Sequence, residues 1–297
     1  ADFDYLKWCV AQVAEAVNEA MENMEPAALK IAVGEAKGKI AYNYYAPDLY
    51  DPRCGVIQAF GTSGKNKDEV IATLVNYAIH PEVIGNKKGI LSPDLCGPLY
   101  DRIEAKAGGL AIFMNGAQGG MVTADNRRPE GKEAGDWEEC IRIGELLADQ
   151  ALAIVDKAPL QTAPLLSSHS KEIKLPVTSP LMKMLIDHSE LGLKVSEDYM
   201  LKTRVNLLNI GSAQILTIPG EALPNIGYYL KRKMNTAHPF LFGLTNDAFG
   251  YMLTKVDYNS FERYEYICKT SLGEETAEVY IEEALQLIEA SPSAENQ

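Results

Sequence analysis

The sequence is poor in the residues that build metal clusters and disulfide frameworks. Of 297 residues, only four are histidine and five are cysteine. The cysteines are scattered without a C-x-x-C pair, which excludes a zinc-finger pattern, and their odd number prevents complete pairing within the chain. We expect buried free thiols, while the sequence leaves one or two disulfides open. The cysteines are Cys9, Cys54, Cys96, Cys140 and Cys268.

Long apolar runs and clusters of positive charge are also missing. No stretch approaches the ~18 to 20 apolar residues that a membrane-spanning helix needs. The longest basic run is Lys231-Arg232-Lys233 and the formal net charge is −13, which argues against nucleic acid as a partner. A hydrophobic fraction of 46% with 23% charged residues is ordinary for a globular protein, so the chain can bury a sizeable core.

The order of the patterns predicts an α/β fold, a single domain on a mixed β-sheet flanked by helices. We expect this domain to span residues 1–289, and the small polar residues 290–297 to form a disordered tail. Predicted helices cover 5–23, 94–107, 137–158, 180–199 (a lid), 223–234 and 271–289, with Ser271 as the N-cap of the last. Predicted strands cover 28–36, 55–60, 70–79, 110–115, 165–177, 205–210 and 213–218, with hairpins joining 55–60 to 70–79 and 205–210 to 213–218. Segments 41–50 and 125–136 are predicted loops.

One predicted strand ends in the first candidate functional residue. The run from Val70 to Ile79 is rich in β-branched and aromatic residues, which is typical of a buried strand. His80 follows it and Pro81 forces a turn, so the imidazole projects from a rigid element toward a loop face, where α/β proteins commonly place their chemistry. Taken alone, a histidine in this position is more often a core or capping residue.

Three further polar clusters lie at strand ends or turns. Ser92-Pro93-Asp94 opens a predicted helix, where Asp94 is equally well explained as the N-cap. The strand 110–115 runs into a glycine-rich segment that ends at Thr123, and its exposed N–H groups can cradle an oxyanion. Glu221 follows an apolar strand and a Pro-Gly turn, where it is either a first-turn acid or a metal ligand. Each signal is weak by itself.

Together these clusters resemble the neutral/alkaline ceramidase family, in the same order over residues 5–288. The run ending at His80-Pro81 looks like that family's strand with a zinc-binding histidine, and Ser92-Pro93-Asp94 is similar to its Ser-x-Asp turn. Ile218-Pro219-Gly220-Glu221 is similar to the Val-Pro-Gly-Glu that supplies a zinc-binding glutamate. Two more segments match: Asn115-Gly116-Ala117-Gln118-Gly119 resembles a glycine-rich turn of bacterial members, and Gly250-Tyr251-Met252-Leu253-Thr254 resembles the segment whose leading tyrosine completes the zinc shell.

The resemblance implies a zinc-dependent hydrolase of an amide bond (N-acyl, ceramide-like) or an ester bond, with His80, Glu221 and Tyr251 as metal ligands. One imidazole, one carboxylate and one phenol leave positions open for water and substrate, as a catalytic zinc requires. The implied substrate is a small-molecule or lipid amide such as a sphingolipid, and the implied location is secreted or periplasmic. The other implied site residues are Asp94, Thr123 and again Tyr251 in catalysis, and Gly116, Gly119 and Gly120 in the oxyanion turn.

Two features depart from the family pattern. The family has a further zinc histidine in a Thr-His-x-His-type segment upstream of the opening helix, and the sequence shows none. We therefore expect that a missing amino-terminal segment or a separate chain completes the site, or that the site is incomplete. Ceramidases carry a catalytic serine where this chain reads Gly120-Met121-Val122-Thr123. The nucleophile is accordingly either Thr123 or a metal-activated water with Asp94 or Asp125 as its base.

The remaining histidines and a pair of arginines have simpler interpretations. His169 and His188 are predicted surface residues and His238 a structural one, and solvated loop charges explain Arg127 and Arg128 better than a grip on substrate. The departures from the family pattern favour a second hypothesis, a catalytically silent relative that binds lipid or glycan or has a structural role. The metal content of the purified protein separates the two hypotheses.

Overall fold

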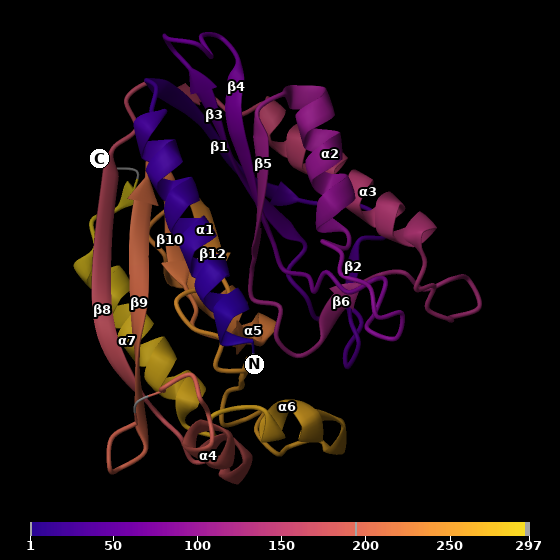
Figure 1. The fold of residues 1–297 in the computed structure, drawn as a ribbon, viewed down its shortest axis with the longest axis vertical. Coiled ribbons are helices and arrows are strands. Elements are labelled where there is room, and N and C mark those ends of the chain that lie inside the picture. The colour runs from indigo at the N-terminus through magenta and orange to yellow at the C-terminus, as the bar shows by residue number, and fades with distance from the viewer. Residues whose placement is uncertain (1, 194, 295–297) are drawn as a thin grey trace.

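Two β-sheets form the centre of the protein in the computed structural model, which describes residues 2–193 and 195–294 (Figure 1). The larger sheet has five strands in the order β5-β4-β3-β1-β7. These are β1 Ala27–Glu35, β3 Arg53–Gly61, β4 Val70–Tyr77, β5 Leu110–Asn115 and β7 Leu160–Gln161. β4 and β5 run parallel and the other neighbours antiparallel, so the sheet is mixed, and β3 and β4 form the predicted hairpin.

Two helices pack together against the larger sheet. They are α2 (Cys96–Ala107) and α3 (Trp137–Asp156). α3 begins after Asp136, whose side chain accepts a hydrogen bond from the N–H of Glu139, and its apolar residues recur at helical spacing, so that one face is buried. That face joins buried side chains of β3 and β4 in one hydrophobic cluster. The strand that leads to His80 is therefore held in the core.

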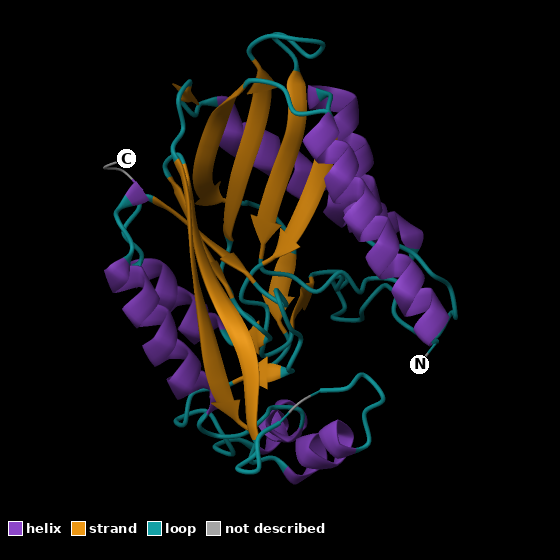
Figure 2. Ribbon diagram, turned by 60° about the vertical axis from the view of Figure 1, so that its left-hand side comes forward, coloured by secondary structure: helices purple, strands orange, loops and turns teal. Residues whose placement is uncertain are grey.

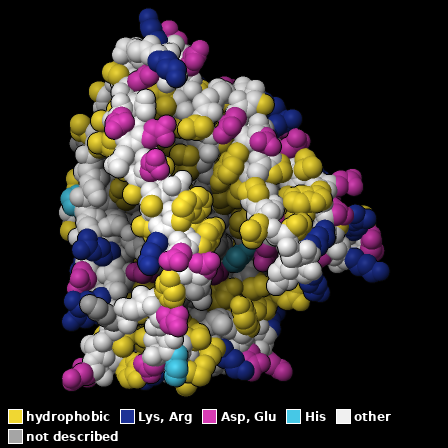
Figure 3. All heavy atoms as spheres, viewed as in Figure 1, with side chains coloured by type: hydrophobic (Ala, Val, Ile, Leu, Met, Phe, Trp, Pro, Cys, Tyr) yellow, Lys and Arg dark blue, Asp and Glu magenta, His cyan; other side chains and the backbone are white. Residues whose placement is uncertain are grey.

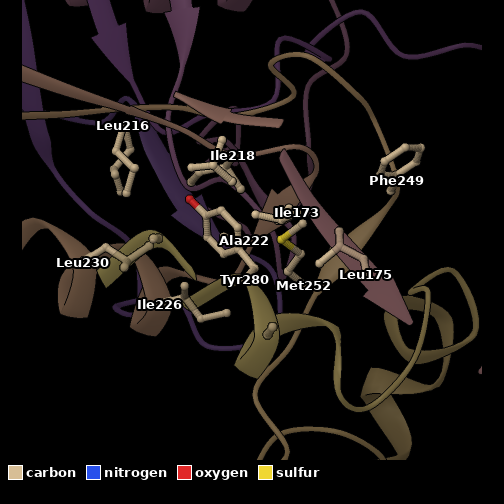
Figure 4. Packing of buried hydrophobic residues seen from close by; sticks show 14 of the residues in the cluster. Ile173, Leu175, Leu216, Ile218, Ala222, Ile226, Leu230, Phe249, Met252 and Tyr280 are labelled. Atoms are coloured by element: carbon tan, nitrogen blue, oxygen red, sulfur yellow. The ribbon is translucent and has the colours of Figure 1, made fainter. Parts of the chain in front are cut away.

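The second sheet has four strands in the order β12-β10-β9-β8 and packs against two helices. The elements are β8 Leu166–Pro176, β9 Met200–Ile210, β10 Ala213–Thr217, β12 His238–Phe242, α5 Pro224–Lys233 and α7 Thr276–Ala290. Figure 4 shows side chains of the strands and of α5 meeting around Tyr280. The Tyr280 hydroxyl donates to the carbonyl of Thr217 at 3.0 Å, which satisfies a polar group that would otherwise be orphaned in the core.

A buried contact joins the two sheets. A small cluster between them takes Ile31 and Ile57 from the larger sheet and Phe240 from the smaller one. Asn76 of β4 adds a polar connection, because its Nδ2 donates to the carbonyl of Leu241 at 2.8 Å. A buried side-chain amide bonded to backbone leaves little freedom for the sheets to slide. The strand ends that carry the candidate ligands are thereby held in fixed relation.

Short elements surround these strand ends. β2 (Ala41–Asn43) pairs with β6 (Val122–Ala124), and β11 (Glu221–Ala222) pairs in parallel with β13 (Tyr251–Met252). The remaining helices are α4 Pro180–Asp187, the 3-10 turn η1 Glu262–Tyr264 and α6 Glu265–Lys269. Pairing between β11 and β13 places two of the predicted metal ligands directly opposite each other.

The first helix, α1 (Phe3–Glu22), stands apart from the rest. Asp2 caps it by accepting a hydrogen bond from the N–H of Tyr5 at 3.0 Å. None of its 20 residues, all of them described, is buried. Apolar side chains such as Trp8 and Val13 are exposed along it. Figures 1 and 2 show α1 lying along the outside of the protein.

The predicted α/β class and mixed sheet are confirmed, while several local predictions need correction. Two main sheets replace the single one. The predicted lid over 180–199 is helical only to Asp187, where His188 caps the end by donating its backbone N–H to preceding carbonyls, and residue 194 lies outside the description. Ser271 is not a helix N-cap, because its hydroxyl bonds within the turn to Gly273 and α7 begins after Glu275. β2 lies inside the predicted loop 41–50.

All five cysteines are free thiols, and only Cys9 is not buried. No helix in the described part of the chain is long and apolar enough to cross a membrane. In the predicted tail, Ala294 is buried and its N–H donates to the carbonyl of Asn235 at 3.3 Å. Residues 295–297 of that tail lie outside the described residues.

Candidate functional site

His80 is held by the glycine-rich segment that follows β5. Its backbone N–H and its ring Nδ1 both lie against the carbonyl oxygen of Val122, at 2.9 and 2.8 Å. A carbonyl oxygen only accepts hydrogen bonds, so Nδ1 must carry the hydrogen. In the neutral ring, Nε2 then has a free lone pair. A histidine whose second nitrogen is oriented by a backbone carbonyl has the arrangement of a metal ligand.

The free nitrogen of His80 points at a carboxylate. Nε2 lies 2.8 Å from Oε2 of Glu221, and both side chains are less than one-fifth exposed. Two lone pairs cannot bond to each other, so a proton or a metal ion has to lie between them. Burial lowers the pKa of His80, but the hydrogen bond and charge of Glu221 outweigh it and raise the pKa above its ordinary value. The pair therefore binds a cation, which is either a proton or a metal ion.

Backbone pairing fixes the position of Glu221. Its N–H donates to the carbonyl of Gly250 at 2.9 Å, and the residue lies opposite Tyr251 in the β11–β13 pair. On the other side, the N–H of Gly119 donates to the carbonyl of Ala222 at 2.9 Å. A Cβ at position 119 would lie 2.2 Å from the carbonyl oxygen of Glu221, so only glycine allows this approach. Glu221 is enclosed by two segments distant in sequence.

Tyr251 completes the group. Its ring is buried and its hydroxyl donates to Sδ of Met121 at 3.5 Å. Burial and the charge of Glu221 both raise the pKa of Tyr251, so the phenol is protonated in the absence of a cation. A bound metal ion would act in the opposite direction and make the oxygen a better donor.

The donor set fits zinc in kind. An imidazole nitrogen, a carboxylate and a phenol oxygen are three protein ligands, the number usual at a catalytic zinc with an open position. No group of three or more histidine, cysteine or acidic side chains that could hold a metal ion occurs in residues 2–193 and 195–294. The site therefore depends on Tyr251, or on a donor from elsewhere, as its third ligand.

At two of the three predicted oxyanion positions in the glycine-rich turn, the N–H group is already bonded to a backbone carbonyl. The N–H of Gly116 donates to the carbonyl of Tyr77 at 3.0 Å, and that of Gly119 to Ala222. Neither is free for a substrate oxygen. Gly120 has a φ of +70°, and its N–H and that of Met121 have no acceptor among the described residues. These two remain as candidate oxyanion donors.

Thr123 lies beside the pair. It forms an isolated parallel bridge with His80 and lines an open pocket of about 490 Å³, together with Tyr44, Glu82 and Met121. Figure 3 shows a hollow in the middle of one face of the protein, with hydrophobic side chains on its rim. Thr123 is thus a hydroxyl residue on a pocket next to the candidate metal ligands.

The two predicted base candidates are both engaged. Asp94, at a φ of +53°, accepts hydrogen bonds from the N–H groups of Val83 and Ile84 at 3.0 and 2.8 Å, so it holds the loop that walls the Thr123 pocket. Asp125 forms two hydrogen bonds with Arg127, at 2.8 and 2.9 Å. Burial raises the pKa of Asp125, but Arg127 outweighs it and the net pKa is lowered, which weakens this carboxylate as a base.

The other histidines lie elsewhere, as predicted. His188 bonds the carbonyl of Met184 at a helix end, and His238 bonds the hydroxyl of Ser212 at 3.0 Å. His169 lies on β8. Arg128 pairs with Asp136 at 2.8 Å.

Sequence reasoning missed the aromatic surroundings of the site. The ring of Tyr266 contacts that of Tyr251 at 5.9 Å between centroids, and Tyr45 contacts Tyr264 at 5.2 Å. The tyrosine-rich run in the predicted loop 41–50 was the available signal. Met121 was also missed as a contact of Tyr251, because its left-handed φ of +64° is not visible in the sequence.

Comparison with known proteins gives a fold and no close relative. No protein-family model and no curated protein matches the chain. Neutral ceramidase from Pseudomonas aeruginosa superimposes with a TM-score of 0.72 at 16% identity, over 92% of this chain and 54% of that one. A ceramidase complexed with C2 gives a TM-score of 0.71 at 16% identity, over 93% and 56%. The predicted likeness to ceramidases is confirmed as a likeness of fold, and the chain spans about half the length of these structures.

Proposed function

We propose that this chain carries the catalytic site of a zinc-dependent hydrolase that cleaves an amide bond (N-acyl, ceramide-like) or an ester bond. One observation carries the proposal. Nδ1 of His80 is fixed by the Val122 carbonyl while Nε2 meets Glu221 at 2.8 Å, a pairing that calls for a cation. The fold shared with neutral ceramidase supports the reaction class and a lipid amide such as a sphingolipid as substrate.

His80, Glu221 and Tyr251 are the residues that would hold the zinc ion. When bound, zinc supplies Lewis acidity toward the scissile carbonyl. The neighbouring N–H groups of Gly120 and Met121, which have no acceptor among the described residues, would donate to a developing oxyanion. Tyr251, protonated in the absence of a cation, would be a weakly bound ligand of that ion.

Thr123 is the proposed nucleophile, with an activated water as the alternative. Its place on the pocket wall beside His80 supports the first choice. Asp94 and Asp125 already accept the hydrogen bonds that hold them, which makes each a weaker candidate for the base of a water. We therefore assign Asp94 to positioning the loop 83–84.

We further propose that polypeptide outside these residues completes the site. The chain spans only about half of the ceramidase structures, and the described donors number three when Tyr251 is included. Residues 1–289 would form one catalytic unit followed by the tail 290–297. We propose a secreted or periplasmic location, which the resemblance to ceramidases supports and which cell fractionation tests.

Metal analysis of the natural protein, purified intact, is the deciding experiment. We expect about one zinc per chain, lost in His80→Ala and Glu221→Ala and retained in the control His238→Ala, whose histidine bonds Ser212 elsewhere. Hydrolysis of short N-acyl substrates should follow the metal, ending with a chelator and returning with zinc. Zinc retained in both site variants would refute the assignment.

A silent, lipid- or glycan-binding relative is the second candidate. It is favoured by the engagement of the Gly116 and Gly119 N–H groups within the fold. A natural protein that is free of metal and inactive on every N-acyl and ester substrate would exclude the hydrolase and favour this candidate.

A further inference from the structure

Five exposed apolar side chains lie around the candidate site. We call them the collar: Tyr44, Ile90, Leu91, Phe261 and Tyr266. Their exposed fractions run from 47% to 102%, with Leu91 the highest. Large apolar side chains scattered singly are normal on a surface, but a group gathered at one pocket marks an interaction site.

Contacts place the collar around the pocket. Tyr44 lines the Thr123 pocket directly, and Ile90 lines an adjoining pocket with Pro81 and Glu82, the two residues after His80. Tyr266 touches the site through its ring contact with Tyr251. The collar thus reaches the two pockets through Tyr44 and Ile90, and the ring of Tyr251 through Tyr266.

Phe261 joins the collar through a chain of rings. It contacts Tyr264 at 5.2 Å, Tyr264 contacts Tyr45 at 5.2 Å, and Tyr45 contacts Tyr44 at 5.7 Å. These aromatic contacts connect the loop before η1 to the wall of the Thr123 pocket. Segments far apart in sequence therefore contribute to one apolar rim.

The form of the collar indicates a lipid surface as its partner. The side chains come from three loops and from helix α6, and they share no single helix face or strand edge, so they suit a fluid partner better than a second folded surface. Two exposed cations accompany them. Lys87 lies on the loop with Leu91, and the guanidinium of Arg263 lies 5.3 Å from the Phe261 ring; neither has a carboxylate partner among the described residues. Apolar tips flanked by unpaired cations match acyl chains beneath phosphate headgroups.

We propose that the collar docks the protein on a lipid surface, with the mouth of the Thr123 pocket facing it. Phe261 and Leu91 enter the acyl boundary, while Lys87 and Arg263 meet headgroup phosphates. This docking needs no metal ion and stands independently of the hydrolase assignment.

Helix α1 supplies the matched control. It also exposes apolar residues, among them Val10 and Val13. Its charges are mostly acidic, with Asp4, Glu15, Glu19 and Glu22 against the single Lys7. Headgroup phosphates repel such a face, so α1 should add little to binding on anionic vesicles.

Vesicle flotation tests the proposal. The probes are phosphatidylcholine vesicles with and without phosphatidylglycerol. We expect the double variant Leu91→Asp, Phe261→Asp to bind about tenfold or more weakly than the unaltered protein, because two apolar side chains are lost from the interface. The control Val10→Asp, Val13→Asp should bind as the unaltered protein does, and so should His80→Ala, which separates docking from metal chemistry.

Each other outcome overturns the docking proposal. An unaltered protein that fails to float, a collar variant that binds normally, or a control that loses binding equally would each do so. Circular dichroism establishes that both double variants are folded. Equal binding by His80→Ala together with lost zinc would leave the docking proposal intact while testing the hydrolase on its own.

Discussion

An ion cluster beneath α5 yields a stability prediction whose size follows from its geometry. Asp51 is 3% exposed at its side chain and shares its carboxylate between Arg53, at 2.7 and 2.9 Å, and Lys231, at 2.9 Å. Lys231 is 7% exposed and Arg53 35%. Because α5 starts just after Glu221, this cluster anchors the helix that follows the candidate ligand.

Replacing Asp51 should lower the free energy of unfolding more than replacing Lys231. Asp51→Asn leaves the ammonium of Lys231 buried beside a neutral amide, and removing one partner of a buried ion pair costs about 3 to 5 kcal/mol. Lys231→Met leaves Asp51 bonded twice to Arg53, so the loss is at most the roughly 1.5 to 3 kcal/mol of one charged hydrogen bond. Methionine also retains most of the apolar stem.

Urea unfolding followed by circular dichroism measures both free energies. The control Lys255→Met breaks an exposed pair with Glu275 and should change the free energy of unfolding by about 0 to 1 kcal/mol. Burial raises the pKa of Asp51, but Lys231 and Arg53 outweigh it and hold the pKa low. This stabilisation is present above pH about 3.9 and is lost as the pH falls through the folded pKa. Equal losses in Asp51→Asn and Lys231→Met would refute the reasoning.

Two further predictions concern the candidate site. Glu221 raises the pKa of His80 in the folded protein, so the His80–Glu221 pair stabilises the metal-free protein below pH about 6.5, and this stabilisation is lost as the pH rises through the folded pKa. Glu221→Gln should flatten this pH dependence of the unfolding free energy, measured by urea titration with a chelator present. An unchanged pH profile in the variant would contradict the prediction. Gly119→Ala brings a Cβ to 2.2 Å from the Glu221 carbonyl oxygen and should therefore lower the free energy of unfolding strongly. The control Gly131→Ala has a φ of +80° and open space around it, so it should lose only the about 1 to 2 kcal/mol of backbone strain. Equal unfolding free energies for the two variants would exclude the close approach at Gly119.

Elements with a clear period were predictable from the sequence. The run Val70–Tyr77 is β-branched and became a central strand, and the helix at Trp137 has both an Asp cap and an amphipathic pattern. Helix α4 is a case in which the apolar pattern does not predict where the helix ends. Apolar residues continue to Leu193, yet α4 ends at Asp187, because a local pattern does not reveal what a segment packs against.

The sequence predicted which residues are candidate ligands and their order along the chain, but it did not predict their contacts. Glu221 and His80 are 141 residues apart, and no local signal states that they meet at 2.8 Å. Ser271 illustrates the converse, since a good capping residue was drawn into a turn with Gly273 and left the cap position to Glu275. Side-chain competition of this kind depends on tertiary structure.

The glycine-rich turn takes on a different meaning once these contacts are joined. Its sequence predicts an oxyanion cradle, but two of its three glycines bond to backbone. Through Val122 the turn fixes the tautomer of His80, and through Gly119 it binds the strand that carries Glu221. One segment therefore orients both His80 and Glu221. The first structural effect of this turn is therefore to bring the imidazole nitrogen and the carboxylate together.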